Sequence, residues 1–299
     1  MKAALRNMLE TAGAWAARSY ITGTHLEDAL RACESLHAHR YRSTVCFWDG
    51  AGDTTESIVS NYSATIASAA KLNIDCYASV KPWPLKHSSD LFRNLASEAG
   101  AHNIKLHFDS ASTEDQEKTL QLIRELLPDG AKLGYTLPGR WGRSLADTDL
   151  AIELGLDVRV VKGQWADPSL QIDPSEGFLR IIERLAGRAR HVSVATHDPK
   201  LAKAALSLLL ARETPCELEL LYGLPVRTVL PVAQETGVPI RVYLPYGHAW
   251  LPYVVGRLRK QPRIALWLLR DMIGSLRLQI AGKGTAARLP IRERSKVDR

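Results

Sequence analysis

The chain has 299 residues, 45% hydrophobic and 24% charged, which is enough to bury the core of one large globular domain or two small ones. Its net charge of +7 is spread along the chain and becomes dense only near the C-terminus, so a solvated basic surface is expected and no nucleic acid partner. Four scattered cysteines without a CxxC pair, and no leader segment, predict reduced thiols in a cytoplasmic protein. Since no apolar run approaches the roughly 20 residues that span a bilayer, at most a peripheral membrane contact is expected.

Short apolar and β-branched runs alternate with helical stretches over most of the chain. Residues 1–40 are expected to form an N-terminal helical arm, residues 41–281 one barrel domain, and residues 282–299 a basic, flexible tail. The eight expected strands begin, in chain order, at Ser43, Ile74, Ile104, Lys132, Asp157, His191, Glu217 and Pro239.

The segments between these runs show the periodicity of amphipathic helices. In TEDQEKTLQLIRELL the apolar residues fall on one helical face, behind a predicted cap at Thr113. Each strand with its helix takes roughly 25 to 35 residues, as a (β/α)8 barrel of about 250 residues requires. The fold class is therefore an α/β protein, a distorted TIM-type barrel with N-terminal helices and a closing helix after strand 8. An open doubly wound sheet is the alternative, but the turn after the first strand lacks GxGxxG.

The carboxyl ends of the barrel strands are where chemistry is expected, because the βα loops gather there. Arg159 lies inside a hydrophobic strand, and a cation in that place needs an anionic or electron-rich partner. An ion pair of Arg159 or Lys162 with Asp109 would satisfy this need and is compatible with function. The other polar residues at strand ends include Lys81, Thr196, His197, Asp198, Glu219 and Tyr243.

Two common kinds of catalytic site lack support in the sequence. No HExxH pair occurs, and His107 and His197 would need a third ligand, so no metal site is predicted. A GxSxG elbow is absent too, which argues against a Ser/His/Asp triad. A basic, aromatic barrel mouth instead suits a large anionic cofactor and a small substrate.

Seven motifs, in order and at the expected strand ends from about Gly23 to Leu269, resemble those of the flavin-dependent proline dehydrogenases, of which the chain would be a divergent member. The resemblance implies a distorted (β/α)8 barrel that binds FAD without a Rossmann motif and oxidises the C–N bond of a cyclic secondary amine. The motifs are SVKP from Ser79, HFDS from His107, VRVVKGQW from Val158, VATHD from Val194, ELELLYG from Glu217, RVYLPYG from Arg241 and YVVGRL from Tyr253.

On the cofactor side, the resemblance places Arg159 beside flavin N5 and Lys162 near the pyrimidine ring, as the two catalytic residues. Fixed cations there stabilise the negative charge that a hydride leaves on the flavin. Thr196 and His197 match residues around the ribose, pyrophosphate and adenine. The remaining cofactor-binding residues implied are Gly163, Trp165 in place of a tyrosine, Leu137 in place of a glutamine, Asp198, Glu219 and Leu220.

On the substrate side, the sequence departs from the family pattern. Lys81 and Asp109 match charged residues at the bottom of the pocket, and Tyr243 matches an aromatic wall. In the family, two adjacent arginines on the closing helix clamp the substrate carboxylate, but here Gly256 stands in the first place; Tyr253 and Arg257 remain. Loss of a charge-assisted contact of roughly 1.5 to 3 kcal/mol would weaken proline binding by about one to two orders of magnitude. An altered pocket for a bulkier or differently held substrate is therefore expected.

The partners implied are a small-molecule amine or imino-acid-like substrate and an electron acceptor, quinone or oxygen. Two alternatives stay open at this point. One is a barrel that binds a ligand or regulates without flavin, and the other is a folate-reductase-like flavoenzyme on a similar barrel.

Overall fold

Eight parallel strands close into a barrel in a computed structural model that describes residues 21–50, 52–164, 167, 170 and 172–248. Because β1 pairs with both β2 and β8, the TIM-type prediction is confirmed and the open doubly wound sheet is wrong. Each strand begins within two residues of its predicted start. The strands are β1 (Arg42–Trp48), β2 (Cys76–Val80), β3 (Leu106–Phe108), β4 (Leu133–Pro138), β5 (Asp157–Val161), β6 (His191–Ala195), β7 (Cys216–Leu221) and β8 (Ile240–Gly247).

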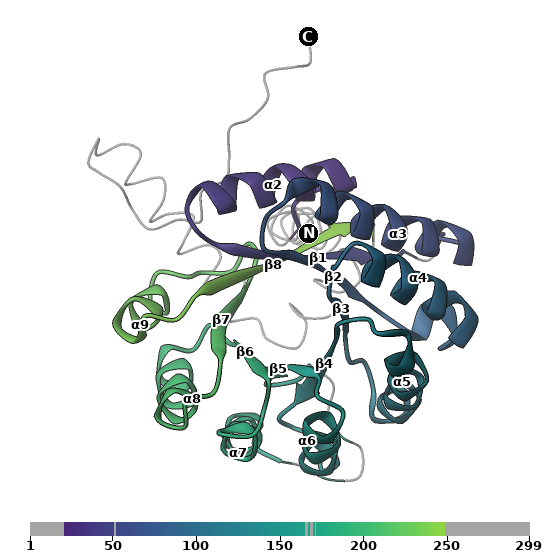
Figure 1. Ribbon diagram of the computed structural model, residues 1–299. Coiled ribbons are helices and arrows are strands. Elements are labelled where there is room, and N and C mark those ends of the chain that lie inside the picture. Colours follow the sequence, from purple (N-terminus) through teal and green to yellow (C-terminus); the bar gives the residue numbers. More distant parts are fainter. Residues whose placement is uncertain (1–20, 51, 165–166, 168–169, 171, 249–299) are drawn as a thin grey trace, which may run out of the picture.

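Helices surround this ring of strands (Figure 1). Helix α2 (Leu26–Ala38) packs against β1 and β8, so it covers the seam where the barrel closes. It is the described part of the predicted arm at residues 1–40. The predicted closing helix and the tail at residues 282–299 lie outside the described residues. The other helices are α3 (Thr55–Leu72), α4 (Ser89–Ala101), α5 (Thr113–Leu126), α6 (Ser144–Glu153), α7 (Pro174–Leu185), α8 (Pro199–Ala211), α9 (Leu230–Thr236) and the 3-10 turns η1 (Trp83–Leu85) and η2 (Leu127–Asp129).

Local sequence signals set several helix starts. Helices α7 and α8 each begin at an Asp-Pro pair, in which the carboxylate of Asp173 or Asp198 accepts two backbone N–H groups of the first turn. Helix α5 is capped by Ser112, whose Oγ accepts from the Asp115 N–H at 3.1 Å. The predicted cap at Thr113 is therefore wrong by one residue, since Thr113 is already the first helical residue.

The hydrophobic core lies between the strands and the helices, whereas the inside of the barrel is polar. Alternate strand residues point to opposite faces, and one face of these strands carries buried charged and hydroxyl side chains. The barrel is thus held internally by ion pairs and hydrogen bonds, in place of the branched apolar layers common in this fold. The buried polar residues on this face are Thr44, Ser79, His107, Thr136, Arg159, Ser193, Glu217, Glu219 and Arg241, whereas Ser43 faces α2.

The remaining predictions about the chain concern its cysteines and the membrane. Cys33, Cys46, Cys76 and Cys216 are all buried and free, as expected for reduced thiols. Within the described ranges, the helices lack the combination of length and apolar character that crossing a bilayer demands.

Candidate functional site

Arg159 lies in the middle of β5 and points into the barrel, where two carboxylates hold it. Its Nε donates to Glu219 at 2.8 Å and its NH1 donates to Asp109 at 2.7 Å. Burial alone would lower the pKa of Arg159, but the charges of Glu219 and Asp109 help to hold it well above its usual value. The predicted ion pair with Asp109 is confirmed for Arg159, which stays a fixed cation.

Asp109 follows β3 and joins Arg159 to the aromatic wall. Tyr243 donates its hydroxyl to Asp109 Oδ2 at 2.7 Å, and the Tyr243 ring lies 4.9 Å from the Arg159 guanidinium carbon. Burial first, and then the charge of Asp109, raise the pKa of Tyr243 well above its usual value, so this hydroxyl keeps its proton. Cys46 also lies at Asp109 Oδ2, at 3.6 Å, and burial raises the pKa of its thiol to about 12. Asp109 therefore accepts from these three donors, and Ser79 Oγ is a fourth, at 2.9 Å from Oδ1.

Lys81 follows β2, the strand next to that of Asp109. Its ammonium lies 3.2 Å from Asp49 and 5.3 Å from the centre of the Trp48 ring. Val80 and Phe108 are register partners in β2 and β3, so Lys81 and Asp109 leave adjacent strands at the same level. A cation and a carboxylate thus stand side by side at the mouth of the barrel.

Lys162 and Gly163 follow β5 at the same end. Lys162 is 38% exposed and lies 3.3 Å from Asp198, which also caps α8. Gly163 has a φ of 88°, and a Cβ there would lie 2.9 Å from Pro138 and 3.0 Å from the Arg140 side chain. Both facts favour glycine at this position. The turn that carries Lys162 and Gly163 therefore packs closely against the end of β4.

Thr196 and His197 follow β6 and are engaged by backbone groups. His197 Nδ1 lies 2.9 Å from the carbonyl oxygen of Pro225, which can only accept, so Nδ1 carries a proton. His197 Nε2 accepts from the Leu221 N–H at 2.9 Å, which makes the ring neutral. Thr196 Oγ1 accepts from the Asp198 N–H at 3.2 Å. His197 thus joins the end of β6 to the loop after β7, and its contact with FAD stays a prediction.

Leu137 and Leu220, two further predicted cofactor residues, lie on the opposite face of their strands from the site. Their neighbours Thr136 and Glu219 point into the barrel, whereas both leucines are fully buried in the core cluster between strands and helices. This placement lends no support to a contact with FAD.

Four predicted residues are not placed. Trp165, Tyr253, Gly256 and Arg257 lie outside the described residues. Their assignments stay predictions from the sequence.

Sequence reasoning missed two residues that bind Arg159 from β2. Ser79 Oγ lies 3.3 Å from Arg159 NH1 and 2.9 Å from Asp109 Oδ1, and the Tyr77 hydroxyl lies 3.3 Å from Arg159 NH2. The signal that could have found them is period two, because Tyr77, Ser79 and Lys81 alternate along one strand. Lys81 was singled out for its charge at a strand end and for its match to the family pattern.

The described residues around the mouth fit an anionic cofactor such as FAD in their donor chemistry. Arg140 Nε is buried without a hydrogen-bond partner among the described residues, and its NH1 donates to the Gln164 carbonyl at 3.1 Å. The half-exposed Lys162 ammonium adds a second cation on the same turn. A flavin ring or a pyrophosphate would supply a hydrogen-bond acceptor for the Arg140 N–H and an acceptor or negative charge for the Lys162 ammonium.

Comparison with known proteins adds to this geometry. No protein-family model matches the chain. Proline dehydrogenase 1 of Bacillus subtilis (strain 168) is 24% identical over 285 residues, which covers 86% of this chain and 90% of that protein. Proline dehydrogenase of Deinococcus radiodurans is 25% identical over 280 residues, with the same coverage of each chain. These relatives confirm the resemblance that the motifs predict.

Solved structures share the fold. Proline utilization A (PutA) from Bdellovibrio bacteriovorus superposes with a TM-score of 0.71 at 17% identity, covering 82% of this chain and 32% of that one. PutA from Corynebacterium freiburgense superposes with a TM-score of 0.68 at 18% identity, which covers 96% of this chain and 34% of that one. The chain spans about a third of the length of these PutA proteins, and at such identity the likeness is one of fold alone.

Proposed function

Because the chain is a divergent member of the proline dehydrogenase family, we propose that it oxidises the C–N bond of proline or a proline-like cyclic secondary amine, with FAD as hydride acceptor. The observation that carries this proposal is Arg159, a guanidinium buried at the barrel mouth and held in one orientation by Asp109 and Glu219. Such a fixed cation suits a reaction in which negative charge develops nearby.

The charges at the mouth also support an amine substrate. Arg159 is paired with two carboxylates, so this group as a whole carries one excess negative charge. Asp109 is the carboxylate nearer the mouth, with 15% of its side chain exposed, against 2% for Glu219. We infer that Asp109 meets the substrate nitrogen, while Lys81, leaving the adjacent strand, meets a carboxylate.

FAD, when bound, would accept the hydride, and reoxidation by quinone or oxygen would complete the cycle. The residues that would hold it are Arg159, Lys162 and the turn at Gly163. Tyr243 keeps its proton and donates a hydrogen bond to the Asp109 carboxylate. No protein base is required if the substrate binds as the neutral amine. The altered carboxylate clamp at Gly256 remains part of this proposal.

Purified protein tests the proposal in two steps. First, bound or added FAD should give the visible absorbance of an oxidised flavin. Protein that takes up no FAD would refute the flavoenzyme and favour a binding or regulatory barrel. Second, anaerobic mixing with proline, hydroxyproline, pipecolate or a non-carboxylated cyclic amine should bleach the flavin. If reduced folate bleaches the flavin and none of the amines does, the folate-reductase-like alternative is favoured.

A matched pair of variants tests the role of Asp109. Asp109→Asn should raise the substrate concentration needed for half-maximal bleaching by about tenfold or more, because a charge-assisted contact is lost. The control is Asp90→Asn in α4, where the carboxylate is 95% exposed. Equal effects of the two substitutions would contradict the proposed contact.

A further inference from the structure

A second concavity opens at the other end of the barrel, away from the candidate active site. It has a volume of about 550 Å³ and is formed by the segments that lead into β1 to β6 and by β8. A volume of this size accommodates a small organic ligand. We call this concavity the basal cavity.

Basic residues predominate in the lining of the basal cavity. Four cations line it with two carboxylates, Asp75 and Asp157. Glu217 contacts two of these cations and Arg190 contacts Asp157, so the whole group of five cations and three carboxylates has an excess of two positive charges. Asn73 and Asn103 also line the cavity, and each has a side-chain amide that can donate hydrogen bonds. The four cations are Arg42, Lys105, Lys132 and Arg241, and the cavity is also lined by His37, His102 and His191.

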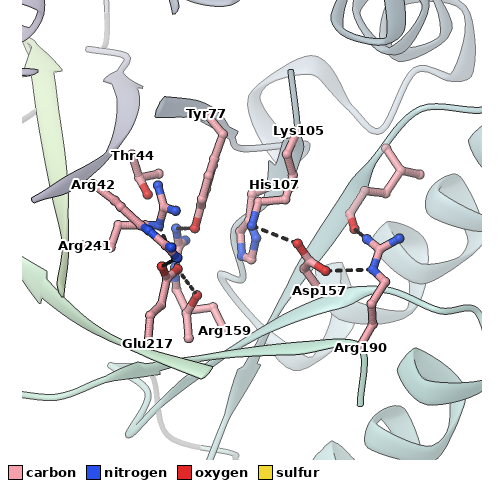
Figure 2. A network of polar contacts seen from close by, with 12 residues as sticks. Arg42, Thr44, Tyr77, Lys105, His107, Asp157, Arg159, Arg190, Glu217 and Arg241 are labelled. Carbon is pink, nitrogen blue, oxygen red and sulfur yellow. Dashed lines mark hydrogen bonds and ion pairs between the residues drawn. The ribbon is translucent and has the colours of Figure 1, made fainter. Parts of the chain in front are cut away.

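Arg42, Lys105 and Arg241 are each held by ion pairs, and Figure 2 shows these groups on the two sides of Tyr77. On one side, Arg241 donates to Glu217 and to Asp75, both at 2.7 Å. On the other, Lys105 lies 3.0 Å from Asp157 and 3.8 Å from the centre of the Tyr77 ring. Anchored donors lose little freedom when a ligand binds, which favours binding.

Other donors of the basal cavity lack partners within the described chain. Lys132 has an exposed side chain and forms no ion pair with any described residue. His191 Nδ1 is buried and has no hydrogen-bond partner among the described residues. Buried polar atoms are satisfied in most native proteins, so this end of the barrel has hydrogen-bonding capacity that the described residues do not use.

We propose that the basal cavity binds a small dianion that carries a phosphate group. Two excess positive charges match the charge of a phosphate monoester or of inorganic phosphate, and the surrounding lysine, arginine, asparagine and histidine groups match its several acceptor oxygens. The cavity volume leaves room for an organic part. This site is separate from the candidate active site and does not depend on the function proposed above.

Calorimetric titration of the full chain, at constant ionic strength, tests this proposal with three probes: inorganic phosphate, glycerol phosphate and succinate. One saturable site for a phosphate probe is expected, with succinate binding at least tenfold more weakly. Tighter binding of glycerol phosphate would identify an ester as the ligand, and tighter binding of inorganic phosphate would identify the free ion. No saturable heat with either phosphate probe, or succinate binding as tightly, would overturn the proposal.

Two variants, one that removes a positive charge and one that removes a negative charge, test whether phosphate binds in the basal cavity. Lys132→Gln should weaken phosphate binding about tenfold, and Asp75→Asn should strengthen it several-fold, because one removes an attraction and the other a repulsion. Lys118→Gln on the exposed face of α5 is the control of equal charge change. If it weakens binding as much as Lys132→Gln does, the effect is one of net charge and the assigned site is wrong. Because the measurement uses heat and not flavin reduction, its outcome is independent of catalysis.

Discussion

Replacing Arg159 by methionine tests whether ion pairs hold the barrel interior together. The substitution would leave Glu219, 2% exposed, and Asp109 without the guanidinium that they contact at 2.8 and 2.7 Å. Breaking a buried pair costs about 3 to 5 kcal/mol, because a buried charge loses its partner. That cost is a large share of the roughly 5 to 15 kcal/mol by which a typical protein is stable.

Urea-induced unfolding without added FAD, followed by tryptophan fluorescence and circular dichroism, measures this loss. The second variant, Arg159→Met with Glu219→Gln, removes the more deeply buried of the two unpaired charges and should recover about 1 to 3 kcal/mol. Arg184→Met breaks an ion pair with Asp149 on the surface and should leave the unfolding midpoint nearly unchanged. The reasoning is refuted if the double variant is no more stable than Arg159→Met, or if Arg184→Met costs as much.

Three further predictions concern pH, a glycine and the substrate. The charge of Arg241 outweighs burial and lowers the pKa of Glu217 to about 2. Glu217 therefore contributes roughly 3 kcal/mol to the free energy of unfolding above about pH 4.5, and this contribution is lost as the pH falls toward 2. Urea midpoints measured against pH should show this loss in the wild type but not in Glu217→Gln. Gly163→Ala should cost about 1 to 3 kcal/mol and weaken FAD binding in a fluorescence titration, since φ is positive and Arg140 must move; unchanged FAD affinity would contradict this. Gly256→Arg should speed flavin bleaching by proline about tenfold or more; no gain would remove this position from substrate choice.

The candidate site could be predicted from the sequence where charge alone marked a residue. Arg159 stands out as a cation within a hydrophobic strand, and its need for an anion led to Asp109, which the structure places at 2.7 Å. Leu137 shows the opposite case. The resemblance expects a glutamine near the flavin at this strand end, but the neighbouring Thr136 faces the interior and Leu137 therefore faces the helices. A motif identifies a position, whereas the pleat decides which side of the sheet a side chain occupies.

By itself, the sequence determined the number, order and approximate starts of the eight strands, because hydrophobic period and turn residues are local properties of the chain. It did not determine that Tyr77 contacts Arg159 through its hydroxyl and both Lys105 and Arg241 through its ring. Nor did it indicate the basal cavity, whose lining comes from segments between residues 37 and 241. Only closure of the barrel brings those segments to one end, and therefore only the tertiary structure decided where the charges gather.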